Sequence, residues 1–153
     1  LSILDVGCGS GYLTACLGRL VDKVNPLGFH GKVWGIDVVP ELVDLTKTNM
    51  KKADNDLLES GVVDINLGDG WKGLPSHAPF HIIHVGAAAE TFPKNLMMQL
   101  ALGGTMVVPV GPVNSHQYLY RVDRLKVSTN FQESDYTIKQ LLGVRYVPLV
   151  RPN

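Results

Sequence analysis

Three glycines at alternate positions, Gly7, Gly9 and Gly11, follow a short apolar segment and precede a helical one. Glycine lets a backbone turn sharply or approach a ligand closely, because no Cβ stands in the way. The following helix would present unpaired N–H groups and a positive dipole end at that turn. With Asp5 just before the first glycine, the spacing indicates S-adenosylmethionine rather than NAD, whose fingerprint is G-x-G-x-x-G. The alternative is a plain tight turn between a strand and a helix.

Further candidate ligand groups end the next three predicted strands: Asp37, Asp69 and the segment His84–Ala87. A carboxylate such as Asp37 can accept hydrogen bonds from both hydroxyls of a ribose. Asp69, flanked by glycines, suits the exocyclic amine of an adenine. The structural alternatives are a helix cap at Asp37 and an ordinary Asp-Gly turn at Asp69. Because these groups lie at successive strand ends, we expect one ligand site there. A place for the His84 side chain in that site is the less favoured of its two interpretations.

Strands and helices alternate along the chain, which predicts a mostly parallel sheet covered on both faces. Two strand-rich segments at the end predict an antiparallel addition at one edge. We therefore expect an α/β, doubly wound, Rossmann-like fold with ligands at the carboxyl ends of the strands. The predicted strands are Leu1–Val6, Lys32–Asp37, Val62–Leu67, Pro79–Val85, Thr105–Val110, Gln117–Lys126 and Gly143–Val147, and the predicted helices are Tyr12–Val24, Pro40–Ala53 and Phe92–Leu100.

Apolar residues at helical spacing support the first two helices and predict the inward positions of the second. Trp34, within a strand, is expected in the core. Trp71 is expected to pack against the protein. The alternative is that its indole ring covers a bound adenine. The apolar positions are Leu13, Leu17, Leu20 and Val24 in the first helix and Leu42, Val43, Leu45 and Met50 in the second.

Length and composition narrow the class of protein. The 153 residues fit one domain, spanning 1–153. Lys and Arg number 14, as do Asp and Glu, so no charge footprint for nucleic acid or an anionic membrane is present. No apolar run is long enough to span a bilayer. We expect a monomer that binds neither nucleic acid nor membrane.

The two cysteines, Cys8 and Cys16, lack metal-ligand spacing, which indicates no metal site and a reduced, cytoplasmic protein. Cys8 lies near the start of a helix, which could lower the pKa of its thiol. The favoured interpretation is a small side chain that fills a tight turn. The chain begins inside its first strand, so we expect a preceding segment to be missing. The loop Asn25–Gly31 is expected to be a surface insertion.

The sequence contains no Ser–His–Asp or Cys–His nucleophile pattern and no paired carboxylates. The absence of these patterns favours a group-transfer reaction in which the protein mainly aligns the two reactants. A methyl sulfonium is already activated, so an in-line displacement needs only an aligned nucleophile. A substrate carboxylate is ionised at neutral pH and would need no general base.

Six segments, in order, resemble the protein-L-isoaspartate (D-aspartate) O-methyltransferase family: LDVGCGSGYLTA, GKVWGIDVVPELVD, GDGWKGLP, APFHIIHVGAAAE, PVGP and GVRYVPLV. The HVGAAA block, PVGP and VPL are more specific than the glycine loop, which most methyltransferases share. The resemblance implies a class I methyltransferase that uses S-adenosyl-L-methionine. Its partners would be isoaspartyl-containing proteins and peptides. Methylation of the free carboxylate of L-isoaspartyl and D-aspartyl residues would begin repair through a succinimide.

The same resemblance assigns the donor site. In the family, a segment before the glycine motif covers the donor and supplies a serine implicated in catalysis, so no catalytic residue is assigned in this chain. The family often follows VPL with threonine where Val150 stands here, and its tail continues beyond Asn153. The assigned residues are Asp5, Gly7, Gly9 and Gly11 for the methionine end, Asp37 with Val38 for the ribose, and Asp69 and Gly70 for the adenine.

Other functions stay open on the sequence alone. A methyltransferase acting on a small molecule or on RNA would share the donor site, although the neutral charge counts against RNA. A nicotinamide oxidoreductase would share the strand–loop–helix unit, although the glycine spacing counts against it. A non-catalytic donor-binding or adaptor module is the remaining alternative.

Overall fold

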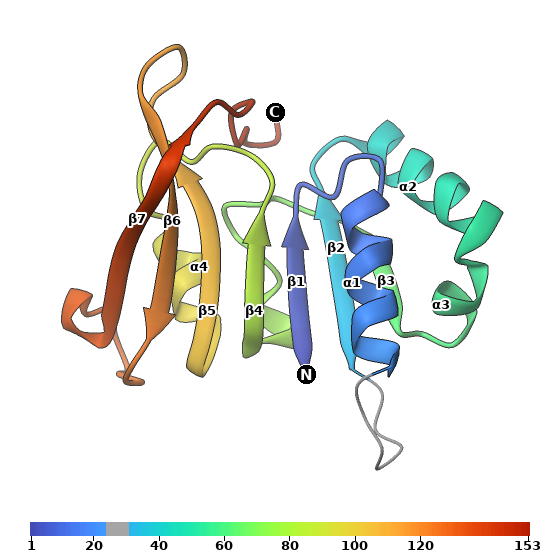
Figure 1. The fold of residues 1–153 in the computed structure, drawn as a ribbon, viewed down its shortest axis with the longest axis horizontal. Helices are drawn as coiled ribbons and strands as arrows, with labels where there is room; N and C mark the ends of the chain where they lie inside the picture. The colour runs from blue at the N-terminus through green and yellow to red at the C-terminus, as the bar shows by residue number, and fades with distance from the viewer. Residues whose placement is uncertain (24–30) are drawn as a thin grey trace.

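Short apolar runs rich in valine and isoleucine form the strands, as expected for residues that suit a pleated, buried surface. The computed structural model describes residues 1–23 and 31–153 (Figure 1). The strands are β1 Ser2–Val6, β2 Lys32–Asp37, β3 Val63–Leu67, β4 Phe80–Val85, β5 Leu100–Val110, β6 Gln117–Arg124 and β7 Tyr136–Val144. The helices are α1 Tyr12–Lys23, α2 Pro40–Ala53, α3 Asn55–Glu59 and α4 Lys94–Met98, with 3₁₀ turns at Pro75–His77 and Glu133–Asp135.

The strands form one seven-stranded sheet in the order β3-β2-β1-β4-β5-β6-β7. β1 to β5 are parallel to their neighbours, and β6 and β7 are antiparallel. The chain runs from β1 outward to β3 and then returns to place β4 on the other side of β1. The strand order therefore reverses between β1 and β4, where α/β sheets form a ligand crevice at the carboxyl edge. The predicted fold class is confirmed.

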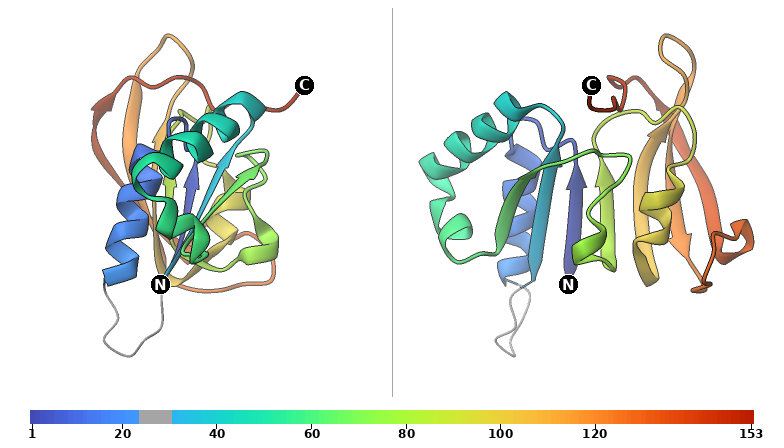
Figure 2. Two further views of the ribbon diagram at one scale, coloured as in Figure 1. Left: turned by 90° about the vertical axis from the view of Figure 1, so that its right-hand side faces the viewer. Right: turned by 180° about the vertical axis from the view of Figure 1, so that it is seen from behind.

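Helices lie on both faces of the sheet, which the edge-on view of Figure 2 shows, with α1 and α4 on opposite sides. One apolar layer lies between the sheet and α1 to α3. The other lies beneath α4 and includes Trp34, which confirms its predicted core position. The first layer contains Ile3, Ala15, Val21, Val33, Val43, Met50, Leu57, Val62, Val63 and Ile65. The second contains Leu4, Val6, Ile36, Phe80, Ile83, Val85, Leu96, Met97, Leu100, Met106, Val108 and Val122.

The apolar positions of the first helix do not all face the sheet, although Leu17 is partly buried against the core. Leu13 and Leu20 are 40% and 59% exposed, whereas the buried residues of α1 are Thr14, Ala15, Gly18 and Val21. The reason is close packing: a Cβ on Gly18 would stand 2.5 Å from Cγ2 of Val63. Small residues let α1 approach the sheet, and the leucines then flank the contact. Val24 and residues 25–30 of the predicted insertion lie outside the described residues.

In α2, Val43 and Met50 are buried as predicted, but Leu45 is 43% exposed. Thr46 is buried in its place, and its hydroxyl donates a hydrogen bond to the carbonyl of Gly9 at 2.7 Å. A polar residue can face inward here because it has a backbone acceptor.

Element ends differ from the prediction in the second half of the chain. The helix expected over Phe92–Leu100 is only Lys94–Met98, and β5 already begins at Leu100. The last strand ends at Val144, near where it was expected to begin. The short helix α3 was not predicted. Among the described residues, no helix combines the length and apolar character needed to cross a membrane.

Candidate functional site

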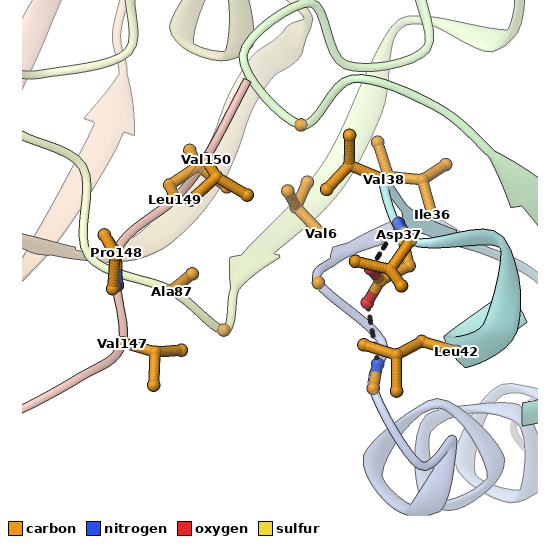
Figure 3. A pocket seen from close by; sticks show the side chains of 15 residues that line it. Val6, Ile36, Asp37, Val38, Leu42, Ala87, Val147, Pro148, Leu149 and Val150 are labelled. Atoms are coloured by element: carbon orange, nitrogen blue, oxygen red, sulfur yellow. Dashed lines mark hydrogen bonds between the residues drawn. The ribbon is translucent and has the colours of Figure 1, made fainter. Parts of the chain in front are cut away.

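A cavity of about 290 Å³ opens at the carboxyl ends of β1, β2 and β4 (Figure 3). The loops after these strands form part of its wall, together with Leu42 of α2, Gly70 after β3 and the segment after β7. It therefore lies at the reversal of strand order. The lining residues are Val6, Gly7, Gly9, Ile36, Asp37, Val38, Val39, Leu42, Gly70, Gly86, Ala87, Val147, Pro148, Leu149 and Val150.

Asp37, at the end of β2, is the one carboxylate in this lining and is 8% exposed. Its Oδ2 accepts a hydrogen bond from the N–H of Gly9, and its Oδ1 accepts one from the N–H of Val39, each at 3.1 Å. Val39, not Asp37, is the N-cap of α2, and no side chain caps it. Asp37 therefore joins the glycine loop to the start of α2, and each oxygen retains acceptor capacity.

The three glycines of the first loop have different environments. Gly7 and Gly9 line the cavity with φ of 76° and 56°, in the left-handed region that favours glycine. Gly11 also has positive φ, but it is not a lining residue. A Cβ on Gly11 would stand 2.7 Å from Cγ2 of Thr46, so this glycine lets α1 pack against α2.

Asp5 lies behind the glycine loop and is not among the lining residues. It is 1% exposed, and its two oxygens are 2.6 Å from Oγ1 of Thr14 and 2.8 Å from Nδ1 of His84. His84, for which a place in the site was the less favoured interpretation, is turned toward Asp5. From the end of β4, Gly86 and Ala87 reach the cavity instead.

Of the predicted adenine pair, the structure places only Gly70 in the lining. A Cβ on Gly70 would stand 2.8 Å from side-chain carbons of both Val6 and Leu149. Asp69 forms the turn that was its structural alternative: its Oδ1 accepts from the N–H of Trp71 at 3.0 Å. A role for the Asp69 side chain toward adenine remains a prediction.

The segment 147–150 was not predicted as part of the site. It crosses the cavity mouth beside the loop after β4, where Ala88 donates to the carbonyl of Val147 and accepts from the N–H of Leu149, each at 2.8 Å. The indole N–H of Trp71 donates to the Leu149 carbonyl at 2.8 Å. Trp71 therefore packs against the protein, as expected. The VPLV sequence was a visible signal, but only its resemblance to the family drew attention to it.

Cys8 follows Gly7 in the loop and is buried. Burial, with the nearby carboxylates Asp5 and Asp37, raises the pKa of its thiol to about 11. The lowered pKa suggested by the helix start is therefore wrong, because desolvation of the thiolate outweighs the hydrogen bond with Thr46. Among the residues the structure describes, no group of three His, Cys, Asp or Glu side chains could hold a metal ion.

The amino-acid sequence is similar to those of known methyltransferases. The family model for protein-L-isoaspartate(D-aspartate) O-methyltransferase matches residues 1–153. A protein-L-isoaspartate O-methyltransferase of Caenorhabditis elegans is 40% identical over 146 residues, which are 95% of this chain and 59% of the relative. Protein-L-isoaspartate O-methyltransferase 2 of Arabidopsis thaliana is 40% identical over 147 residues, 95% of this chain and 43% of the relative.

The fold is also similar to that of a solved methyltransferase structure. A crystal structure from Plasmodium falciparum, assigned as a protein-L-isoaspartate O-methyltransferase and complexed with S-adenosyl-L-homocysteine, matches with a TM-score of 0.80 and 27% identity. The match covers 97% of this chain and 65% of that one. This chain thus covers less than two thirds of the length of each of these three proteins.

Proposed function

The chain belongs to the protein-L-isoaspartate(D-aspartate) O-methyltransferase family, and we propose that it binds S-adenosyl-L-methionine and takes part in methylating isoaspartyl carboxylates in damaged proteins. The match over residues 1–153 carries the substrate part of this proposal. The cavity at the carboxyl ends of the strands supports the donor part.

The residues around the cavity fit a nucleoside. Asp37 offers acceptor capacity on both oxygens to a ribose, and the backbone approaches closely at Gly7 and Gly9. At Gly70 a side chain would fill the space, since its Cβ would collide with Val6 and Leu149. Asp37, Gly7, Gly9, Val38 and Gly70 are therefore the residues we propose to contact the donor directly.

Asp5, Gly11 and Asp69 do not line the cavity, but they hold in place the segments that do. Asp5 holds the first turn of α1 and β4 together through Thr14 and His84. Gly11 allows α1 and α2 to approach each other, and Asp69 shapes the turn that presents Gly70. We propose that these three position the donor site from behind.

Apolar side chains make up most of the cavity wall, including Val6, Ile36, Leu42 and Leu149. Such a wall excludes water from the reaction, and it leaves Asp37 as the one charged lining group. When bound, S-adenosyl-L-methionine supplies a methyl group on a sulfonium, which an ionised carboxylate can accept without a general base. The role of the protein is then to align the two reactants.

A cytoplasmic location and a monomeric state are the further parts of this proposal. Cys8 and Cys16 are the only cysteines of the chain, and both are unpaired thiols. Unpaired thiols are typical of proteins in a reducing compartment.

Methyl transfer tests the proposal. The protein is incubated with methyl-labelled S-adenosyl-L-methionine and a peptide containing one isoaspartyl residue, with its normal aspartyl twin as control. We expect label on the isoaspartyl peptide alone, and strongly reduced label with Asp37→Asn. Equal labelling of the two peptides would contradict the proposed substrate, whereas failure to bind S-adenosyl-L-homocysteine would contradict the proposed donor site.

A further inference from the structure

A second cleft, of about 670 Å³, adjoins the donor cavity. The two share Val147 and Pro148, so this short segment separates them. The cleft lies between the turn before β6 and the segment after β7. Its lining residues are Val113, Asn114, Ser115, His116, Gln117, Arg145, Tyr146, Val147 and Pro148.

Gln117 joins the two walls of this cleft. It is 5% exposed, and its Oε1 accepts a hydrogen bond from the N–H of Tyr146 at 2.8 Å. Its Nε2 donates to the carbonyl of Pro112 at 3.4 Å, a longer contact. Because this buried amide forms hydrogen bonds to both walls, it holds them at a fixed separation, and the cleft is a preformed feature of the structure.

The charge of the cleft has one sign. Arg145 is its one permanently charged side chain, and none of the described residues that line it is Asp or Glu. Arg145 is exposed and forms no hydrogen bond or ion pair with any described residue. The whole chain has a formal net charge of zero, so the free guanidinium is a local excess of positive charge.

We propose that this cleft holds the polypeptide next to the isoaspartyl residue, and that Arg145 favours an acidic side chain in that flanking segment. The inference rests on the proposed function, because it takes the acceptor carboxylate to enter the donor cavity. A polypeptide whose carboxylate enters there must continue beside the opening, and the cleft adjoins it across Val147 and Pro148. Its polar side chains suit an exposed peptide backbone.

The position of Arg145 sets where the acidic residue should be. Arg145 precedes Val147 by two residues, a span of at most about 7 Å. An extended peptide covers about 3.3 Å per residue. The acidic side chain should therefore lie within about three residues of the isoaspartyl residue. Because the guanidinium is exposed, its preference should be modest, about threefold to fivefold in affinity, and weaker at high salt.

Peptide binding in the presence of saturating S-adenosyl-L-homocysteine tests this inference without requiring turnover. Fluorescence anisotropy would compare isoaspartyl peptides with Glu, Gln or Lys two residues away on either side, together with their normal aspartyl twins. We expect the tightest binding with Glu and the weakest with Lys, on at least one side. Arg145→Gln should abolish this order, while Lys139→Gln, an exposed change on β7, should preserve it. In turnover, Arg145→Gln should raise KM for the Glu peptide and leave kcat unchanged.

The outcomes separate the two proposals. Tight binding of isoaspartyl peptides over their twins, with no dependence on the flanking charge, would overturn the role of Arg145 and leave the proposed function standing. A charge preference that survives Arg145→Gln would also overturn it. Equal binding of isoaspartyl and aspartyl peptides would overturn the proposed function and this inference with it.

Discussion

Asp5 on β1 and His84 on β4 are partners across the parallel strands, and Oδ1 of the buried carboxylate lies 2.8 Å from Nδ1 of the imidazole. The other oxygen of Asp5 accepts a hydrogen bond from Thr14 on α1. One acidic side chain thus links two strands and the helix that starts at the glycine loop. The donor cavity is therefore supported by a polar cluster that does not itself line it.

Thr14→Val should destabilise the protein. The change keeps the shape of a fully buried side chain but removes the 2.6 Å hydrogen bond to Asp5. A buried carboxylate oxygen that loses its partner costs about 1–3 kcal/mol. Urea unfolding measures the difference, with Thr137→Val, at an exposed position of β7, as the control. Equal stability of the two variants would show that this bond contributes nothing.

Asp37→Asn should weaken donor binding by about tenfold to a hundredfold, since hydrogen bonds to a charged group contribute about 1.5–3 kcal/mol. In the native protein the N–H groups of Gly9 and Val39 each donate to one oxygen of Asp37. The NH2 group of the asparagine would face one of these donors, and that hydrogen bond would be lost. Calorimetry with S-adenosyl-L-homocysteine measures the affinity. Asp44→Asn, an exposed change on α2, should have no effect. Unchanged affinity in Asp37→Asn would remove the ribose assignment.

Gly70→Ala should reduce donor binding while the protein stays folded. The new Cβ would collide with Val6 and Leu149 at 2.8 Å, and relief by a shift of Leu149 would narrow the cavity. Such overpacking costs about 1–3 kcal/mol. Gly143→Ala is the matched control, because its Cβ would meet no atom closer than 3.9 Å. The same calorimetric titration applies, and equal affinity in both variants would place the donor away from Gly70.

Cys8 should resist alkylation at pH 8, because a thiol with a pKa of about 11 is about 0.1% ionised there, and only the thiolate reacts. Cys16 is exposed and should be labelled. Mass spectrometry after iodoacetamide treatment distinguishes the two sites, and labelling of both in denaturant is the control. Rapid labelling of native Cys8 would contradict its buried, protonated state.

The raised pKa of Cys8 also has a consequence for stability. In the unfolded chain the thiol ionises near its ordinary value of 9.0, but in the native state only near 11. Its contribution to stability is therefore present below pH 9 and is lost as the pH rises toward 11. Cys8→Ala should show a smaller fall in the free energy of unfolding over that interval. A fall of the same size in both proteins would assign the pH dependence to other groups.

The sequence predicted the sheet and the loops at its carboxyl edge because their signals are local. Glycines and an acid directly after an apolar run placed Gly7, Gly9, Asp37 and Gly70 at strand ends, and the structure brings these four to one cavity. Val38 came from resemblance to the family and also lines the cavity. The direct contacts of these residues with the donor stay predictions, as does the single-domain organisation.

What could not be predicted depends on contacts between distant segments. Nothing local indicates that Val147 would bond to Ala88 and thereby form a wall of the cavity. Likewise, the burial of Asp5 depends on Thr14 and His84 closing over it. The buried face of α1 also depends on such contacts, since small residues, Gly18 above all, control how closely this helix approaches the sheet.

The most direct test of the account is a competition in one tube between an isoaspartyl peptide and its normal aspartyl twin, with S-adenosyl-L-methionine and the protein. Mass spectrometry would follow both peptides over time. We predict that only the isoaspartyl peptide gains the mass of a methyl group, and that part of it later appears as normal aspartyl peptide through the succinimide. Methylation of both peptides at equal rates, or of the aspartyl peptide alone, would contradict it.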